Sequence, residues 1–296
     1  MDLRFARNEG PFFFTFQNVR AFPIFFKFGP MTNNSKIATF AKNAAFRLLR
    51  IAGALLLIYV SMVFYLALTE RRNAFPRAIT HKEANAAIEK TATPLTCTLD
   101  DGTALGGFSL GNNADPTLLY FPEADEDAAQ FLAQVENIPG INIVTFNYRG
   151  SASNKGTPSE ENFVSDARQI LECATQVNGN RPQTLAGRGT GAILAAELAY
   201  KGAVLVFIDP IFDIADAISQ KYRYLYPKFL VRTSTKADLN KLSSSENPIY
   251  VIYDKKSAET ASRGAAASLS NKNEISRDGR NISTIILQVI NKNLYQ

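Results

Sequence analysis

Residues 185–196, LAGRGTGAILAA, carry the pattern in this chain that comes nearest to covalent catalysis. An apolar run leads into a glycine-flanked turn, and an Ala/Leu-rich helix is expected to follow. In many hydrolytic enzymes a strained strand-turn-helix of the form G-x-S-x-G exposes a nucleophilic serine at its centre. Gly189 stands at that centre here, so the turn offers no nucleophilic side chain.

Two other interpretations of the turn remain open. The amides of Gly189 and Thr190 would lie at a helix N-terminus, where they could bind an anion. Arg188 or Arg280 could add positive charge to such a site. Alternatively the turn is only structural, because glycine adopts a strained backbone conformation at little cost, and the sequence favours this interpretation. A Walker-type phosphate loop is poorly supported, since G-x-x-x-x-G-K-[ST] does not occur in the chain.

Few other residues have the chemistry of a catalytic or metal site. His81 is the only histidine of the chain, and it precedes the expected domain, so we expect it to be solvent-exposed rather than catalytic. Asp209 and Asp213 bracket an apolar stretch, and such carboxylates more often end strands or cap helices than form acid/base pairs. Cys97 and Cys173 lie far apart without C-x-x-C spacing, so we expect buried free thiols and neither a metal site nor a disulfide framework.

The elements that would position these residues alternate between short apolar strands and helices. A hairpin is predicted over 94–111, with Asp101-Gly102 as its turn. Further strands are predicted at 117–123, 141–150, 183–189, 203–210, 248–254 and, more weakly, 273–278. Helices are predicted at 125–138, 159–178, 190–200, 257–270 and 282–294. This alternation predicts a mostly parallel sheet with helices on both faces. The long segment 211–247 predicts a small insert over the carboxyl ends of the strands, where such folds bind ligands.

Residues 51–69 form an uncharged run of 19 residues, long enough to cross a hydrocarbon core of about 30 Å. We expect a transmembrane helix at 48–70 rather than a cleaved signal peptide, because no A-x-A-like site follows the run; a buried core helix is the other alternative. An N-terminal arm (1–47), a juxtamembrane linker (71–94) and the folded domain (95–296) would complete the chain. Translation from Met31 would leave residues 1–30 untranslated.

The basic character of the chain belongs to its N-terminal part. Residues 1–73 hold 10 Lys/Arg against 3 Asp/Glu, whereas residues 74–296 hold 22 against 24. The folded part therefore lacks the basic stripe of a nucleic-acid-binding protein. The wholly basic flank before the apolar run favours a cytoplasmic N-terminus and a non-cytoplasmic domain. The stretch KYRYLYPKF (221–229) mixes bases with aromatics and either contacts lipid headgroups or packs within the insert.

The segment 147–171, NYRGSASNKGTPSEENFVSDARQIL, carries a family-specific pattern. The residues that match are Tyr148, Arg149, Gly150, Ser153, Gly156, Pro158, Ser159, Glu160, Asp166 and Ala167. Together with IDPIFDIADA (208–217), they resemble the membrane-anchored α/β-hydrolases of the serine aminopeptidase-like or BEM46-like branch. The resemblance covers residues 75–296 and implies an α/β-hydrolase fold, a mostly parallel twisted sheet preceded by one transmembrane helix.

The same resemblance indicates which catalytic positions have changed. The nucleophile position falls on Gly189, the acid position on or near Ser257, and the histidine position on Arg280. The oxyanion segment falls on residues 122–124, where Glu123 would place negative charge near a developing oxyanion. A serine hydrolase needs a hydroxyl, a base and a group that orients the base, so the resemblance implies a degenerate triad.

We therefore expect a membrane-anchored hydrolase-fold protein that is catalytically inactive and serves in binding or scaffolding. The lipid bilayer is its expected partner through residues 51–69, and neither a cofactor nor nucleic acid is expected to bind. An acyl or lipid-like ligand would occupy the old active-site cleft, beside Gly189, Thr190, Arg188 and Glu123. The alternative is an active ester, lipid or peptide hydrolase that uses unrecognised residues.

Overall fold

The computed structural model describes residues 34–75, 77–135 and 138–294, so the expectations about residues 1–30 and Met31 lie outside the described residues. The chain divides into two units, residues 1–56 and 57–296. Helix α1, Asn34–Ala74, begins in the first unit and ends in the second. Within the described residues it is the one helix long and apolar enough to cross a membrane, over Ile37–Ala74.

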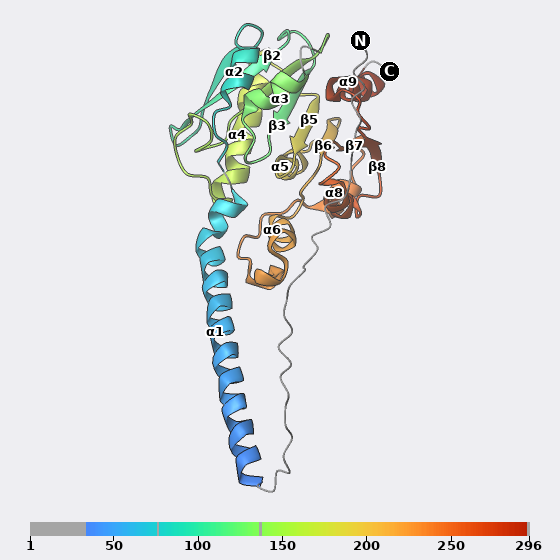
Figure 1. Cartoon of the computed structure of the whole chain (residues 1–296). Coiled ribbons are helices and arrows are strands. Elements are labelled where there is room, and N and C mark those ends of the chain that lie inside the picture. The colour runs from blue at the N-terminus through green and yellow to red at the C-terminus, as the bar shows by residue number, and fades with distance from the viewer. Residues whose placement is uncertain (1–33, 76, 136–137, 295–296) are drawn as a thin grey trace, which may run out of the picture. The chain divides into compact units, whose positions relative to one another are not determined.

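Eight strands of the described residues form a single sheet in the order β1-β2-β4-β3-β5-β6-β7-β8 (Figure 1). Strand β2 pairs antiparallel with both β1 and β4, and every other pairing is parallel. The predicted mostly parallel sheet with an antiparallel edge is confirmed. The strands are β1 Thr93–Thr98, β2 Ala104–Leu110, β3 Thr117–Phe121, β4 Asn142–Phe146, β5 Thr184–Arg188, β6 Val204–Ile208, β7 Ile249–Tyr253 and β8 Lys272–Ser276.

Helices cover both faces of the sheet, because alternate side chains of its buried strands enter two separate apolar cores. In β3, Leu119 and Phe121 face the core that contains α4, α5 and α8, whereas Leu118 and Tyr120 face the core that contains α2, α3 and α9. This alternation is the expected period of two along a strand. The helices are α2 Lys82–Ile88, α3 Ala128–Val135, α4 Glu160–Asn178, α5 Gly191–Glu197, α6 Ile214–Tyr222, α7 Leu239–Ser243, α8 Glu259–Ala266 and α9 Ile282–Leu294.

The family-like segment around α4 has a structural explanation. Ser159 caps α4 through a capping box in which its hydroxyl and the Asn162 side chain each accept a hydrogen bond from the other residue's backbone N–H. The Arg149 guanidinium binds the Asp166 carboxylate through two hydrogen bonds of 2.8 and 2.9 Å. It also donates to Asp101, whose pKa it lowers to about 2. Arg149 thus joins the β1-β2 turn to helix α4.

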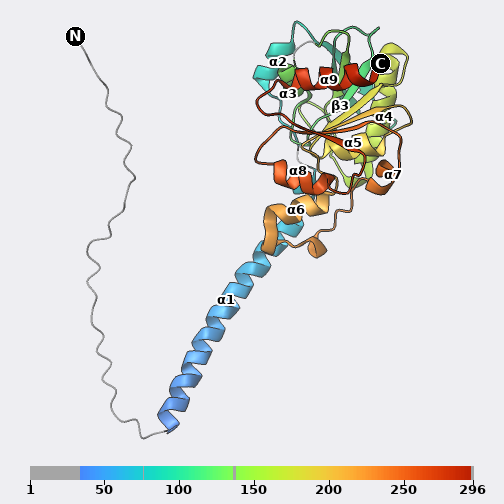
Figure 2. The same cartoon turned by 90° about the vertical axis from the view of Figure 1, so that its right-hand side faces the viewer.

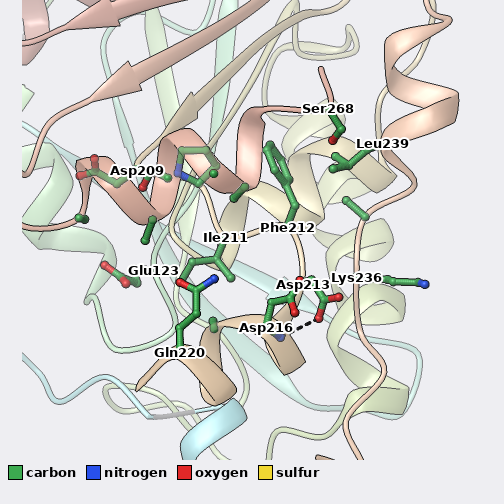
Figure 3. A pocket seen from close by; sticks show the side chains of 18 of the residues that line it. Glu123, Asp209, Ile211, Phe212, Asp213, Asp216, Gln220, Lys236, Leu239 and Ser268 are labelled. Carbon is green, nitrogen blue, oxygen red and sulfur yellow. Dashed lines mark hydrogen bonds between the residues drawn. The ribbon is translucent and has the colours of Figure 1, made fainter. Parts of the chain in front are cut away.

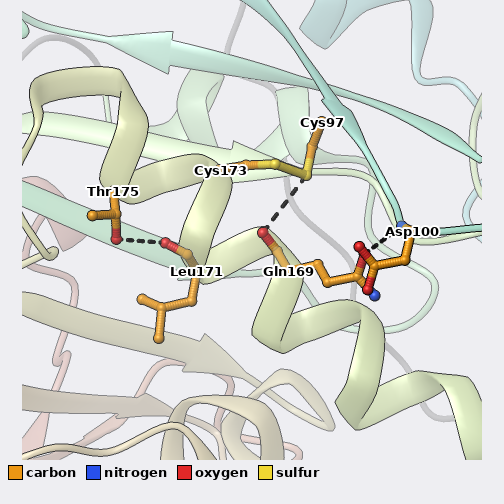
Figure 4. Close-up of a disulfide and its surroundings, with 6 residues drawn as sticks. All are labelled: Cys97, Asp100, Gln169, Leu171, Cys173 and Thr175. Carbon is orange, nitrogen blue, oxygen red and sulfur yellow. Dashed lines mark hydrogen bonds between the residues drawn. A yellow bond between two sulfur atoms is a disulfide. The ribbon is translucent and has the colours of Figure 1, made fainter. Parts of the chain in front are cut away.

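The expectation of free thiols is wrong. Cys97 of β1 and Cys173 of α4 are joined in a disulfide with their Cα atoms 5.7 Å apart (Figure 4), within the range that a disulfide requires. The edge strand packs on α4 and brings together two residues that are 76 positions apart. Spacing along the sequence gave no sign of this packing.

The segments expected as a linker and an insert both contain helices. Residues 71–94 include α2, which His81 caps by accepting a hydrogen bond from the Ala84 amide through Nδ1 at 3.3 Å. Residues 211–247 follow β6 and contain α6, α7 and two short 3₁₀ helices, η1 Arg223–Leu225 and η2 Lys228–Leu230. Figure 2 shows α6 at the end of the domain where α1 ends. The insert therefore adjoins α1 as well as the sheet.

Candidate functional site

The glycine turn has the geometry of a nucleophile elbow. Strand β5 ends at Arg188, Gly189 adopts φ +52°, and α5 begins at Gly191. A Cβ at Gly187 would lie 2.3 Å from the Gly191 carbonyl oxygen, and a Cβ at Gly191 would lie 2.2 Å from the carbonyl oxygen of Phe121. The three glycines are therefore required by close backbone approach and by a left-handed conformation that other residues adopt at a cost.

The space in front of Gly189 is filled by a carboxylate. A Cβ at Gly189 would lie 2.8 Å from the carboxyl carbon of Glu123. Burial raises the pKa of Glu123, although Lys255, with its Nζ 3.3 Å from Oε2, acts in the opposite direction. An ion pair thus occupies the place where a nucleophile would extend from the elbow.

The amide of Gly189 and the side chain of Arg188 are already engaged. The Gly189 N–H donates to the Ile208 carbonyl at 3.0 Å, and Arg188 is turned into the protein, where it is 3% exposed. Thr190 is also buried, and its Oγ1 has no hydrogen-bond partner among the described residues. The anion site suggested for this turn would have to form without the Gly189 amide and the Arg188 guanidinium.

Arg188 instead forms the centre of a buried cluster, here named the elbow cluster. Its guanidinium contacts Glu126 Oε1 at 2.8 Å and Asp254 Oδ2 at 3.1 Å. The Tyr120 hydroxyl donates to the second oxygen of Glu126 at 2.7 Å, and Arg277 pairs with the second oxygen of Asp254. The sequence alone does not reveal this cluster. Its only signal was a charged residue, Arg188, at the end of an otherwise apolar strand.

The other two positions expected from the triad line different hollows. Ser257 follows β7 and lines a hollow beside the insert, with Tyr224 and Pro227. Arg280 follows β8 and lines a separate hollow with Arg188, while its Nη2 donates to the Ser276 carbonyl at 2.6 Å. Gly189, Ser257 and Arg280 are thus placed at the strand ends, as the topology requires, but Ser257 and Arg280 line different hollows.

A cleft of about 1040 Å³ lies between the carboxyl ends of the strands, the insert and α8 (Figure 3). Glu123 and Lys255 line its base, and Ile211, Phe212 and Leu239 give it apolar surface. Its remaining lining is rich in charge and includes Asp209, Asp213, Asp216, Lys221 and Lys236. The cleft can therefore hold a ligand with both apolar and polar parts.

The two aspartates flagged in the sequence end a strand and cap a helix, and both also line the cleft. Asp209 follows β6 and accepts hydrogen bonds from the Asp254 and Lys255 amides at 3.0 and 2.9 Å. Asp213 caps α6 by accepting from the Asp216 amide at 3.0 Å. His81 is not among the residues that line the cleft. Within residues 34–75, 77–135 and 138–294, no group of three or more His, Cys, Asp or Glu is arranged to hold a metal ion.

Comparisons with known proteins identify the fold. The chain is similar to an esterase of Pyrococcus furiosus, Pf2001 (TM-score 0.52, 15% identity, 74% of this chain and 96% of that one). It is also similar to an alpha-beta hydrolase of Vibrio vulnificus (TM-score 0.58, 17% identity, 76% and 91%) and to the proline iminopeptidase-related protein TTHA1809 of Thermus thermophilus (TM-score 0.52, 12% identity, 69% and 99%). With the strand order above, the chain has the α/β-hydrolase fold.

The relatives found by sequence comparison are uncharacterized, so they indicate no activity for this chain. The chain is 28% identical over 161 residues to the uncharacterized proteins Rv2307c and MT2364 of two Mycobacterium tuberculosis strains. The match covers 51% of this chain and 57% of theirs, so the chain spans little more than half the length of these relatives. No protein-family model matches the chain.

Proposed function

We propose that this chain is a single-pass membrane protein of the serine aminopeptidase-like or BEM46-like branch whose hydrolase-fold domain binds a ligand without hydrolysing it. One observation carries the proposal: the carboxylate of Glu123 lies where a side chain at Gly189 would project. The elbow itself is retained, so the change concerns the chemistry of the site and leaves the scaffold intact.

The physical case against hydrolysis is that all the required groups have changed. Acyl transfer by a serine hydrolase needs a hydroxyl, a base and a group that orients the base, whereas the matching positions carry Gly189, Arg280 and Ser257. The tetrahedral intermediate also needs donors aimed at its oxyanion. Glu123 places a carboxylate beside the elbow instead, and a negative charge there opposes a developing oxyanion.

The proposed ligand is acyl or lipid-like. The apolar side chains of Ile211, Phe212 and Leu239 line one part of the cleft, and the charged pair of Glu123 and Lys255 lines its base. Such a cleft suits a molecule with an apolar body and a polar head, because a few polar groups fix orientation while apolar surface contributes affinity. The neighbouring α1 helix would place the cleft near a source of such molecules.

The proposed location of the domain is the non-cytoplasmic side of the membrane. Helix α1 supplies the anchor through residues 51–69, and the disulfide between Cys97 and Cys173 supports the side. Disulfides persist in secreted and cell-surface environments and are rare in the reducing cytosol. A maleimide reagent should modify these cysteines only after reduction when the full-length chain is denatured, since Cys97 is buried in the folded domain. Modification without reduction would contradict the assignment.

The catalytic part of the proposal is tested on the full-length chain in detergent. We expect neither turnover of short p-nitrophenyl esters nor labelling by a fluorophosphonate probe. The residue to test as an alternative nucleophile is Thr190, whose buried Oγ1 has no hydrogen-bond partner in the described part of the chain. Labelling that disappears in Thr190→Ala would establish an active ester, lipid or peptide hydrolase and would overturn the proposal.

Ligand binding is tested with a fluorescent fatty acid. Ala217 of α6 lines the cleft, so Ala217→Phe would fill part of it and should weaken binding at least about tenfold, which is equivalent to about 1.4 kcal/mol. The matched control is Ala267→Phe, at an exposed position outside the cleft lining. Equal binding by the two variants would place the fatty acid elsewhere.

A further inference from the structure

The tip of the insert, residues 223–230, exposes aromatic side chains that the domain does not cover. Tyr224 is 90% exposed and Phe229 is 83% exposed. Outside α1, the only other large hydrophobic residue exposed to this degree in the described part of the chain is Ile79. Tyr224 and Phe229 lie five positions apart in one short segment, and exposed apolar residues that occur together mark protein or membrane interaction sites.

This tip is fastened to the membrane helix at several levels. The Tyr226 hydroxyl and the Thr233 amide donate to Glu70 at 2.6 and 2.7 Å. Near the end of α1, the Tyr222 hydroxyl donates to Asn73 at 3.1 Å. Farther along the helix, toward its N-terminus, the Tyr59 hydroxyl donates to the Tyr224 carbonyl at 3.3 Å. The position of the tip along α1 is therefore fixed by hydrogen bonds.

Helix geometry places the tip at the level of lipid. The predicted span 51–69 is about 28 Å long at 1.5 Å per residue, close to the thickness of a hydrocarbon core. Tyr59 lies ten residues before Thr69, which is about 15 Å along the axis. If α1 crosses the membrane, a segment bonded to Tyr59 cannot remain in bulk water beyond the headgroups.

The charges of the tip suit the same location. Lys221 and Arg223 are exposed and lie beside the aromatic residues, whereas Lys228 is held by Asp213 and Asp216, and Arg232 by Glu70 and the Ala67 carbonyl. Aromatic rings favour the boundary between headgroups and acyl chains, and guanidinium groups bind phosphate through paired hydrogen bonds. The composition is that of an interfacial segment with apolar and cationic groups on one surface.

We propose that the insert tip docks into the leaflet on the domain side of the membrane, with Tyr224 and Phe229 among the acyl chains and the Arg223 side chain extending toward lipid phosphate. The inference rests on the proposed function insofar as α1 must cross that membrane. The occupant of the exposed surface is the bilayer itself, because the surface is continuous with the helix that the bilayer surrounds.

The sequence offers a clean experiment, since the chain contains no tryptophan. Tyr224→Trp and Phe229→Trp each add a single fluorophore at an exposed position, and the full-length chain is reconstituted in vesicles of phosphatidylcholine and phosphatidylglycerol with brominated acyl chains. Phe64→Trp, at an exposed position in the span, reports on the anchor. Asn180→Trp is the control, since its exposed loop precedes β5 at the amino ends of the parallel strands, whereas the insert follows β6 at their carboxyl ends.

Quenching by the brominated lipids separates the outcomes. Because acyl chains would surround both tip residues, both tip variants should lose at least about twofold more emission than Asn180→Trp. Quenching of Phe64→Trp without quenching of the tip overturns the docking proposal and leaves the anchor standing. Absence of quenching at Phe64→Trp overturns the anchor as well. Tip emission that is blue-shifted but unquenched would mean that protein, such as a second copy, covers the surface.

Discussion

Two buried clusters of charge differ in how their ions are compensated. In the elbow cluster, the cation of Arg188 is neutralised by the carboxylates of Glu126 and Asp254. In the second, here named the anchor cluster, Glu70 accepts hydrogen bonds from the Tyr226 hydroxyl and from the backbone and hydroxyl of Thr233. The cation nearest to it, Arg232, is 3.5 Å away and mostly exposed.

This difference indicates which contacts stabilise each region. A buried ion pair loses much stability when one partner is removed, because the remaining charge has neither water nor a counter-ion. A carboxylate that is solvated by neutral donors can be replaced by a neutral acceptor at smaller cost, because its partners carry no charge. The elbow cluster should therefore act on the whole domain, and the anchor cluster mainly on the attachment of the insert to α1.

The largest effect is expected from Arg188→Met. It leaves Glu126 and Asp254 buried without the central cation, and such a loss typically costs about 3–5 kcal/mol. The free energy of unfolding of the full-length chain in detergent, measured with denaturant, gives the value. Lys201→Met is the control because its ion pair with Glu246 is fully at the surface, where pairs contribute about 0–1 kcal/mol. Similar losses in both variants would remove the distinction drawn for the elbow cluster.

Glu70→Ala should have a smaller and more local effect. It deprives the Tyr226 hydroxyl and the Thr233 amide of their acceptor, and an unsatisfied buried donor costs about 1–3 kcal/mol. Trypsin should then cleave faster after Lys228 and Arg232, because the insert is released from α1.

Glu70→Gln keeps one acceptor oxygen. Its rate of cleavage by trypsin should therefore fall between those of Glu70→Ala and the wild type. Glu161→Ala, at an exposed position on α4, is the control and should leave the cleavage pattern unchanged. If Glu70→Ala lowered the free energy of unfolding of the domain as much as Arg188→Met, both clusters would stabilise the whole domain and the proposed difference between them would be wrong.

Gly189→Ser is expected to have the next largest effect on stability. At φ +52° a side chain is strained, at a cost of about 1–3 kcal/mol, and its Cβ would meet Glu123 at 2.8 Å. Adding Glu123→Ala should recover part of the lost stability, because the clash is then removed. Neither variant should gain labelling by a fluorophosphonate. The control is Gly264→Ser in α8, where an added Cβ meets nothing within 4 Å.

The fold was predictable because its signals are local. Each buried strand is a short apolar run, and the glycines of the turn at 187–191 stand where backbone atoms approach closely. The cap of α4 at Ser159 was likewise visible in the sequence. Such features depend on a few neighbouring residues, so a single sequence suffices to find them.

Contacts between distant segments were not predictable. The disulfide joins Cys97 to Cys173 through the packing of β1 on α4, and the elbow cluster joins residues at the ends of β3, β5, β7 and β8. Glu70 follows an uncharged run and was interpreted only as the flank of a membrane helix, although it binds residues more than 150 positions away. A lone charge beside an apolar run indicated that a partner must exist, but the sequence could not identify that partner.

The smallest expected effect, Glu123→Gln, tests whether the carboxylate at the elbow stabilises the fold. Because burial raises its folded-state pKa above the ordinary value of 4.5, ionisation favours the unfolded state. The wild type should therefore lose stability as pH rises from 4.5 through the folded-state pKa. Glu123→Gln does not titrate, so its stability relative to the wild type should be greater at pH 7 than at pH 4. Glu246→Gln at the surface should show no such trend. A glutamine variant that is relatively weaker at pH 7 would mean that the ion pair with Lys255 outweighs the cost of burial, and the elbow would then be a site held together by Glu123.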